Sequence, residues 1–160
     1  MKDYDDILVS LRRITRAIDL HSRRLHKETG LTTSQLLVME IIDRLEDPSP
    51  SMIAREIVLS QATVTTLLDR LEKSGHVLRT RSAADKRQVS VSLTPRGEEV
   101  VGNAPELLQA GFLREFRKLP DYQRNLLVAS LQQIAHLMAA DELEASPILV
   151  LGEFENTPPG

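Results

Sequence analysis

The chain of 160 residues contains neither cysteine nor tryptophan, and it has only two tyrosines and three phenylalanines. Without thiols it can form no disulfide bond, no thiolate metal site and no peroxide-sensing cysteine. So few aromatic rings also leave little material for a platform on which the bases of single-stranded nucleic acid could stack. These absences exclude sensors that depend on cysteine and argue against a protein that binds single-stranded nucleic acid.

Long apolar segments are absent as well. The longest uninterrupted apolar runs, such as 36–39 and 148–151, have four residues, whereas a helix that spans a bilayer needs roughly 20. The acidic residues 1–6 are not followed by the apolar stretch of a secretory signal. We therefore expect a cytoplasmic protein with no membrane partner.

Common catalytic motifs are missing too. The sequence has no glycine-rich phosphate loop, no Gly-x-Ser-x-Gly elbow and no His-Glu-x-x-His. Its four histidines, His21, His26, His76 and His136, are scattered along the chain. We therefore expect neither enzymatic activity nor a cofactor.

The residues that are present indicate a mainly helical fold. Hydrophobic residues make up 41% of the chain, and apolar positions at helical spacing run through 7–25. Three further helices are predicted, at about 33–45, 51–57 and 60–74, and Thr32 with Gln35 forms a capping box before the first of them. The last two helices are separated by a tight turn, an order typical of a helix-turn-helix motif.

The spacing of apolar residues then changes from a period of 3.6 to a period of 2. Residues 77–81 and 89–93 alternate in this way, which predicts a small β-hairpin. Pro95 opens a helix that we expect to reach about Leu119, with a kink or local irregularity that Gly102, Pro105 and Gly111 favour. The fold class is therefore mainly α with one hairpin.

The end of the chain differs in character. A last helix is predicted after Pro120, with Leu127, Leu131, Ile134 and Met138 on one stripe. Beyond it, residues 145–160 contain three prolines and read as an extended tail. Within this tail we expect the apolar run 148–151 to pack as an arm.

Positive charge is concentrated in the hairpin region, between His76 and Gly97. That segment holds five bases and one acid, a local charge of +4, in a chain whose net charge is −3. The remainder must then carry −7. A basic hairpin directly after a helix-turn-helix points to duplex DNA, although each feature alone is more often unrelated to nucleic acid.

The exposed face of the second helix of the motif carries short hydrogen-bonding side chains. Such side chains can contact base edges in the major groove, and a threonine methyl can touch thymine. Arginines at a hairpin tip suit the neighbouring minor groove, and Asp85 could hold the Arg87 guanidinium in place. The predicted DNA-contacting residues are Ser60, Gln61, Thr63, Thr65, Thr66, Arg70, Arg79, Arg81, Asp85, Lys86 and Arg87.

Six short motifs together resemble the MarR family of bacterial winged-helix regulators. They are Leu31-Thr-x-x-Gln35, Ile53-Ala54, Ser60-Gln-Ala-Thr-Val-Thr65, Leu68-Asp-Arg-Leu-Glu-Lys-Ser-Gly75, Asp85-Lys-Arg87 and Leu93-Thr-Pro-Arg-Gly97. The resemblance covers about residues 5–143. Each motif alone is weak, but their order and spacing are specific.

The resemblance implies one domain over 1–144, with a winged helix-turn-helix at about 31–97 and dimerisation helices at about 5–29 and 95–143. It further implies a homodimer that binds double-stranded DNA at a palindromic operator and represses transcription. On this view 60–66 opens the recognition helix, and Asp85 and Arg87 form the Asp-x-Arg pair of the wing. The tail at 145–160 lies outside the family pattern.

Members of the family usually release DNA when a small, often anionic, molecule binds between the dimer helices and the winged lobe. Four side chains could recognise such an effector: Arg13, Arg16, His21 and Arg24. The tail also resembles MarR-like regulators of compatible-solute (ectoine) genes, which suggests a role in osmotic stress.

Two alternatives stay open on sequence grounds. The acidic remainder of the chain is compatible with a winged-helix protein-interaction module that does not read DNA. A metal-responsive regulator is the other, because His21 and His26 lie near acids, although their spacing of five does not place both on one helical face.

Overall fold

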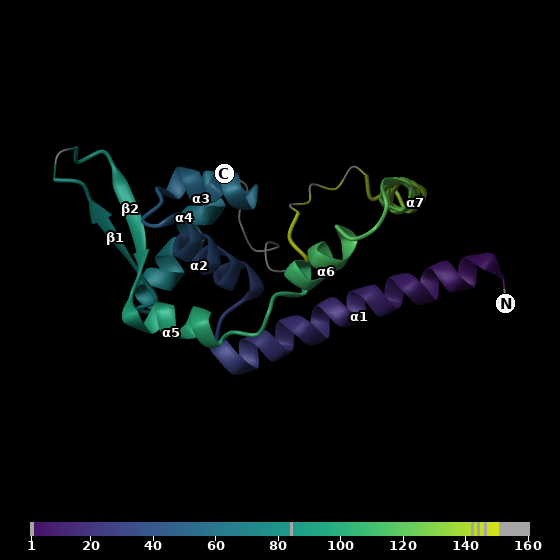
Figure 1. Ribbon diagram of the computed structural model, residues 1–160, viewed down its shortest axis with the longest axis horizontal. Coiled ribbons are helices and arrows are strands. Elements are labelled where there is room, and N and C mark those ends of the chain that lie inside the picture. The colour runs from purple at the N-terminus through teal and green to yellow at the C-terminus, as the bar shows by residue number, and fades with distance from the viewer. Residues whose placement is uncertain (1, 84, 142, 144, 146, 151–160) are drawn as a thin grey trace.

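The computed structural model describes residues 2–150 except 84, 142, 144 and 146. The described residues form mostly helices, together with one β-hairpin (Figure 1). This confirms the predicted fold class. The elements are α1 (Asp3–Thr29), α2 (Thr33–Leu45), α3 (Pro50–Ile57), α4 (Gln61–Lys73), β1 (Val77–Arg81), β2 (Val89–Leu93), α5 (Pro95–Asn103), α6 (Leu108–Phe116) and α7 (Asp121–Leu137).

Side-chain caps fix where the helices of the lobe begin. The Thr32 hydroxyl accepts the Gln35 backbone N–H at 3.2 Å, while Gln35 Oε1 accepts the Thr32 N–H at 3.0 Å, so the predicted capping box is confirmed. Ser49 and Ser60 cap α3 and α4 in the same way, through the N–H groups of the residues three positions on. Each cap satisfies a backbone donor that the helix itself leaves unpaired.

Helix α2 is the centre of the winged lobe. It contacts α1, α3, α4, α5 and β2, and Leu36, Val38, Met39 and Ile42 are almost completely buried. Apolar side chains of α3 and α4 close the core from the other side, among them Ile53, Ile57, Val64, Leu68 and Leu71. One continuous core therefore holds the helix-turn-helix in place.

The two strands form an antiparallel pair in which Val77 lies opposite Leu93 and Arg79 opposite Val91. The Val91 side chain is fully buried, and its backbone N–H donates to the Pro48 carbonyl at 2.9 Å. The middle of β2 is thereby attached to the link between α2 and α3, while the tip of the hairpin extends away from the lobe (Figure 1).

The predicted irregularity between Pro95 and about Leu119 is a complete break, so the prediction of one helix over this range was wrong. Two helices, α5 and α6, are separated by residues 104–107. Ala104 is extended, with φ −67° and ψ 147°, because a helical conformation is disfavoured directly before Pro105. The chain therefore changes direction between the winged lobe and its C-terminal helices.

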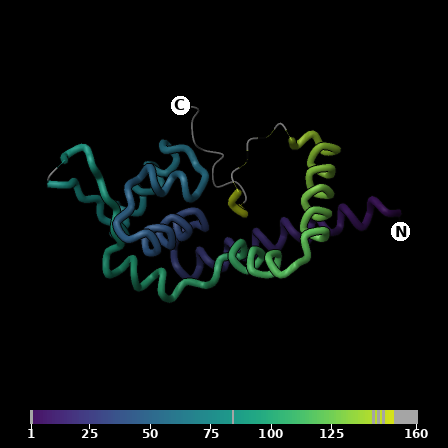
Figure 2. Tube along the Cα trace, turned by 45° about the horizontal axis from the view of Figure 1, so that its top comes forward, coloured from purple at the N-terminus to yellow at the C-terminus, as the bar shows by residue number. Residues whose placement is uncertain are grey.

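Two helices carry apolar side chains that the described chain does not cover. Helix α1 leaves Ile7, Leu8 and Ile14 exposed, and no described residue of α7 is buried. Figure 2 shows α7 standing away from the winged lobe and α1 running past α6 toward the N-terminus. No helix among the described residues has the length and apolar character that crossing a membrane requires.

Part of the predicted tail is also described. The Ile148 side chain is only 8% exposed and belongs to the main core, and Val150 packs against it. The prediction of a packed arm holds for 148–150, while Leu151 and the rest of the predicted tail to 160 lie outside the described residues.

Candidate nucleic-acid interface

The turn between α3 and α4 gives the helix-turn-helix its shape. Val58 ends α3 in the left-handed conformation, with φ 56° and ψ 47°, and the Leu59 N–H donates to the Ala54 carbonyl at 3.1 Å. A β-branched residue rarely adopts this conformation. The turn places the first residues of α4 at the surface.

Helix α4 has one buried face and one outward face. Val64, Leu67, Leu68 and Leu71 pack into the core, which fixes the rotation of the helix about its own axis. The predicted DNA-contacting residues of α4 fall on the other side. Ser60, Gln61, Thr65, Thr66 and Arg70 are exposed, and Thr63 is half-buried.

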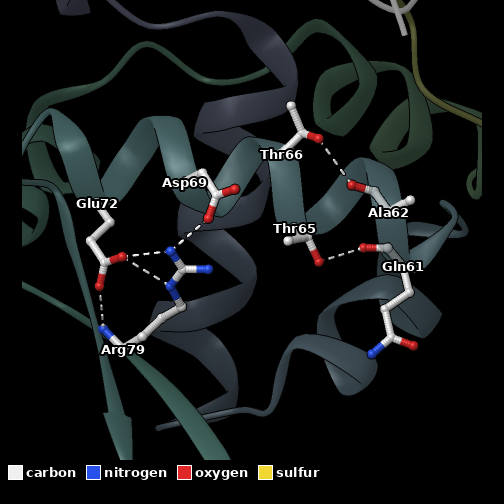
Figure 3. Close-up of polar contacts among 7 residues, drawn as sticks. All are labelled: Gln61, Ala62, Thr65, Thr66, Asp69, Glu72 and Arg79. Carbon is white, nitrogen blue, oxygen red and sulfur yellow. Dashed lines mark hydrogen bonds and ion pairs between the residues drawn. The ribbon is translucent and has the colours of Figure 1, made fainter. Parts of the chain in front are cut away.

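The threonines of this face already donate their hydroxyl protons within the helix. Thr65 Oγ1 donates to the Gln61 carbonyl at 2.8 Å and Thr66 Oγ1 to the Ala62 carbonyl at 3.1 Å (Figure 3). Their hydroxyl oxygens can still accept hydrogen bonds, and their methyl groups remain available for apolar contact. Gln61 and Arg70 make no side-chain hydrogen bond within the described chain.

Asp85 organises the tip of the hairpin, though not through the predicted ion pair. Its Oδ1 accepts the backbone N–H of Arg87 at 2.9 Å, and its carbonyl accepts the Gln88 N–H at 2.9 Å. A short polar side chain that bonds the backbone two residues on is a standard way to close a turn. Asp85 thus shapes the turn, and the Arg87 side chain is left exposed.

The recognition helix and the hairpin line one cavity of about 690 Å³. Gln61 of α4 and Arg87 of the hairpin both line it, together with Ser49 and Ser51 at the start of α3. Two predicted site residues that are 26 positions apart in the sequence are therefore brought to one surface depression. Lys86 and Arg81 are exposed elsewhere on the hairpin.

Arg79 lies against the recognition helix (Figure 3). Its Nε donates to Glu72 Oε2 at 3.0 Å and its Nη2 to Asp69 Oδ1 at 2.6 Å, while its backbone N–H donates to Glu72 Oε1 at 3.2 Å. The side-chain hydrogen bond with Arg79 lowers the pKa of Glu72, and the same bond raises the pKa of Arg79.

The sequence reasoning missed Asp69 and Glu72 as partners of this arginine. A usable signal was present, because two acids three residues apart share one helical face directly before a basic strand. The contact of Arg79 with DNA stays a prediction, since its guanidinium already has two carboxylate partners.

The four predicted effector-binding residues of α1 have mixed surroundings. Arg16 and Arg24 form ion pairs with Asp19 and Glu28, at 3.7 and 2.8 Å, and Arg13 is exposed. His21 Nε2 accepts the Leu108 N–H at 3.2 Å, which joins α1 to the start of α6. Burial lowers the pKa of His21, with a further lowering from Arg24 and an opposing rise from Glu28.

The described residues contain no cluster of three or more histidine, aspartate or glutamate side chains that could hold a metal ion. The His136 ring and Asp141 do meet, with Nδ1 and Oδ2 2.8 Å apart, but this is an exposed pair near the end of α7.

Known proteins with similar sequences are transcriptional regulators. The MarR family model matches residues 31–89. The regulator SarZ of Staphylococcus epidermidis is 33% identical over 101 residues, which make up 63% of this chain and 68% of SarZ. TtmR of Methylorubrum extorquens is 43% identical over 72 residues, 45% of this chain and 37% of TtmR.

Solved structures show the same arrangement. The structure of reduced AbfR bound to DNA has a TM-score of 0.52 and 29% identity, and covers 84% of this chain and 94% of AbfR. The Staphylococcus aureus MepR–DNA complex has a TM-score of 0.59 and 16% identity, over 86% of this chain and 99% of MepR. At that identity the second match concerns the fold alone.

The outward recognition helix and the adjoining hairpin define a winged helix-turn-helix protein. By sequence, the chain belongs to the MarR family. Membership in this family of transcriptional regulators confirms the predicted resemblance and the prediction that the chain is not an enzyme. The suggested link to compatible-solute genes stays a prediction.

Proposed function

We propose that this protein is a homodimeric repressor that binds a palindromic operator in double-stranded DNA in the cytoplasm. One observation carries the proposal: Gln61 at the start of α4 and Arg87 of the hairpin line one depression, and Thr65, Thr66 and Arg70 of α4 are exposed. A helix with such a face fits the major groove, and an arginine at the tip fits the adjoining minor groove. The structure of AbfR bound to DNA, at 29% identity, supports DNA binding by this chain.

The uncovered apolar surfaces of α1 and α7 support the homodimer. Tyr4, Ile7 and Leu8 of α1 and Leu127 and Leu131 of α7 are all exposed, and patches of this kind mark protein–protein contacts. In this proposal the residues at about 5–29 and 95–143 dimerise, and those at about 31–97 form the DNA-binding lobe. Two lobes related by a twofold axis then match a palindrome.

An effector that releases the DNA belongs to the same proposal. It would bind near Arg13, Arg16, His21 and Arg24 of α1, a region that His21 joins to α6. An anionic molecule would have to compete with the internal ion partners of Arg16 and Arg24. Movement of the α1–α6 junction would then change the separation of the two lobes.

Gel-shift titration against fragments of the host genome tests DNA binding. We expect a preferred fragment, and an affinity that falls steeply, by about a hundredfold or more, between roughly 50 and 200 mM salt. A folded protein without sequence preference at low salt would contradict the proposal and favour a protein-interaction module. Light scattering tests assembly separately, because a particle of 17.9 kDa at micromolar concentration would rule out the dimer.

A further inference from the structure

A groove lies between the winged lobe and α6, and residues 147–149 of the C-terminal segment border it. Its lobe side is lined by Leu37 and Ile41 of α2 and Ile57 of α3. Phe112 and Leu113 line the α6 side. The remaining space has a volume of about 530 Å³.

The segment is anchored by one buried side chain. Ile148 is 8% exposed and is part of the same core cluster as Ile41 and Ile57. On the other side, the Leu149 N–H is 3.4 Å from Gln109 Oε1 of α6, which accepts it. The segment therefore contacts both bodies that the groove separates.

Helix α6 has few other means of attachment to the lobe. None of its described residues is buried. Residues 104–107 form a non-helical link to α5, and Leu107 at the end of this link is buried in the core. His21, through the Leu108 N–H, fixes only its first residue. An apolar segment that lies against both α6 and the lobe adds a further attachment, at Gln109 of α6, to the one at Leu107.

We propose that residues 147–150 act as an intramolecular strap, which binds the groove between the lobe and α6 and fixes the orientation of the recognition helix relative to α6 and α7. The consequence for DNA rests on the proposed function. If α1 and α7 form the dimer contact, the strap sets the separation of the recognition helices of the two protomers before the protein binds DNA. A lobe that is already oriented loses less conformational freedom on binding.

Crosslinking tests the docking without DNA, and the absence of natural cysteine makes the labelling specific. Cysteines replace Gln109 and Leu149, and a short bis-maleimide reagent joins them. We expect an intrachain product, whose yield falls when Ile148→Ser is added and is retained when Leu143→Ser is added. Leu143 is 71% exposed and serves as the matched control. An interchain product, or a yield indifferent to Ile148→Ser, would overturn the strap.

The orienting role is tested in the full chain by hydrogen exchange and by DNA binding. Ile148→Ser should speed exchange of the α6 amides, whereas Leu143→Ser should not, with helix content checked by circular dichroism. Operator affinity should fall roughly 5- to 10-fold for Ile148→Ser. Unchanged α6 exchange, or an affinity that is unchanged or tighter, would overturn the orienting role. If the unmodified protein binds no DNA, the proposed function fails, while crosslinking and exchange still decide the strap.

Discussion

The guanidinium of Arg79 lies against the carboxylate of Glu72, so that the first strand of the wing is bonded to the recognition helix. The contact involves both the side chain and the backbone of Arg79, and Asp69 joins it one helical turn away. The Arg79 side chain is 27% exposed, so solvent screens this network less than a surface ion pair. The first strand of the wing is thereby held to the recognition helix.

Replacement of this arginine should loosen the wing. We expect Arg79→Ala to lower the free energy of unfolding by about 1–2 kcal/mol, because two carboxylates lose their charged donor. Urea denaturation followed by circular dichroism measures the change. Arg81→Ala is the control, since Arg81 lies on the same strand but is exposed and should change stability by less than about 0.5 kcal/mol. Equal losses in both variants would show that the ion-pair network does not stabilise the lobe.

Arg87 should matter for DNA rather than for folding. Its side chain is exposed, and only its backbone is bonded to Asp85. We expect Arg87→Ala to weaken operator binding by roughly 1–3 kcal/mol with no loss of stability. Fluorescence anisotropy measures this, with Arg117→Ala as a control that removes the same charge from an exposed position beyond α6. Equal weakening in both variants would mean that net charge alone matters.

Gly97 is required for close packing at the start of α5. A Cβ at this position would run into the His76 carbonyl group, well inside van der Waals contact. Gly97→Ala should therefore cost about 1–3 kcal/mol despite the better helix propensity of alanine. Gly102→Ala, in the same helix with open space around it, should gain up to about 1 kcal/mol. Thermal melting of the two variants should show shifts of opposite sign.

Replacement of Val58 by glycine should stabilise the turn between α3 and α4. Its positive φ is unfavourable for a residue with a Cβ, and its side chain is 63% exposed, so little burial is lost. We expect Val58→Gly to raise the free energy of unfolding by about 1 kcal/mol. Val58→Ala keeps the Cβ and should gain much less. A glycine variant that is no more stable than the alanine variant would show that the turn is not strained.

Stability should fall when the pH drops below the usual histidine range. Burial lowers the pKa of His76 from its ordinary value of 6.5, and Arg96 lowers it further. The unfolded chain therefore takes up a proton near pH 6.5 while the folded chain does not, and stability is lost as the pH falls through this window. Urea midpoints between about pH 5 and 8 measure the slope.

A His76→Gln variant isolates this contribution. The variant will be less stable at every pH, because His76 is buried and its Nδ1 lies 2.6 Å from Ser74 Oγ. Its loss of stability below pH 6.5 should nevertheless be smaller than that of the unmodified chain. The remainder should come partly from His21, whose pKa is also lowered. A slope that is identical in both proteins would exclude His76 as its source.

The sequence predicted those features that depend on neighbouring residues. Thr32 and Gln35 marked the start of α2, and the bounds of that helix and of both strands were correct, because caps and apolar periodicity act locally. The break at residues 104–107 was underestimated, since Gly102, Pro105 and Gly111 were read as a kink or local irregularity within one helix. The partners of Arg79 were missed because they depend on how β1 crosses α4, a relationship that only the packed lobe determines. Asp85 bonds the backbone of Arg87 rather than its guanidinium for a similarly geometric reason.

Helix α7 has 17 residues and buries none of them within the described chain. A helix of this length is marginal in water when nothing packs against it. If its apolar face is covered only by a second copy, the order of α7 depends on how much protein is present. Dilution should then lower the melting temperature, and chains synthesised at low copy number would assemble slowly. The amount of the protein in the cell would thereby determine what fraction of it is folded and assembled.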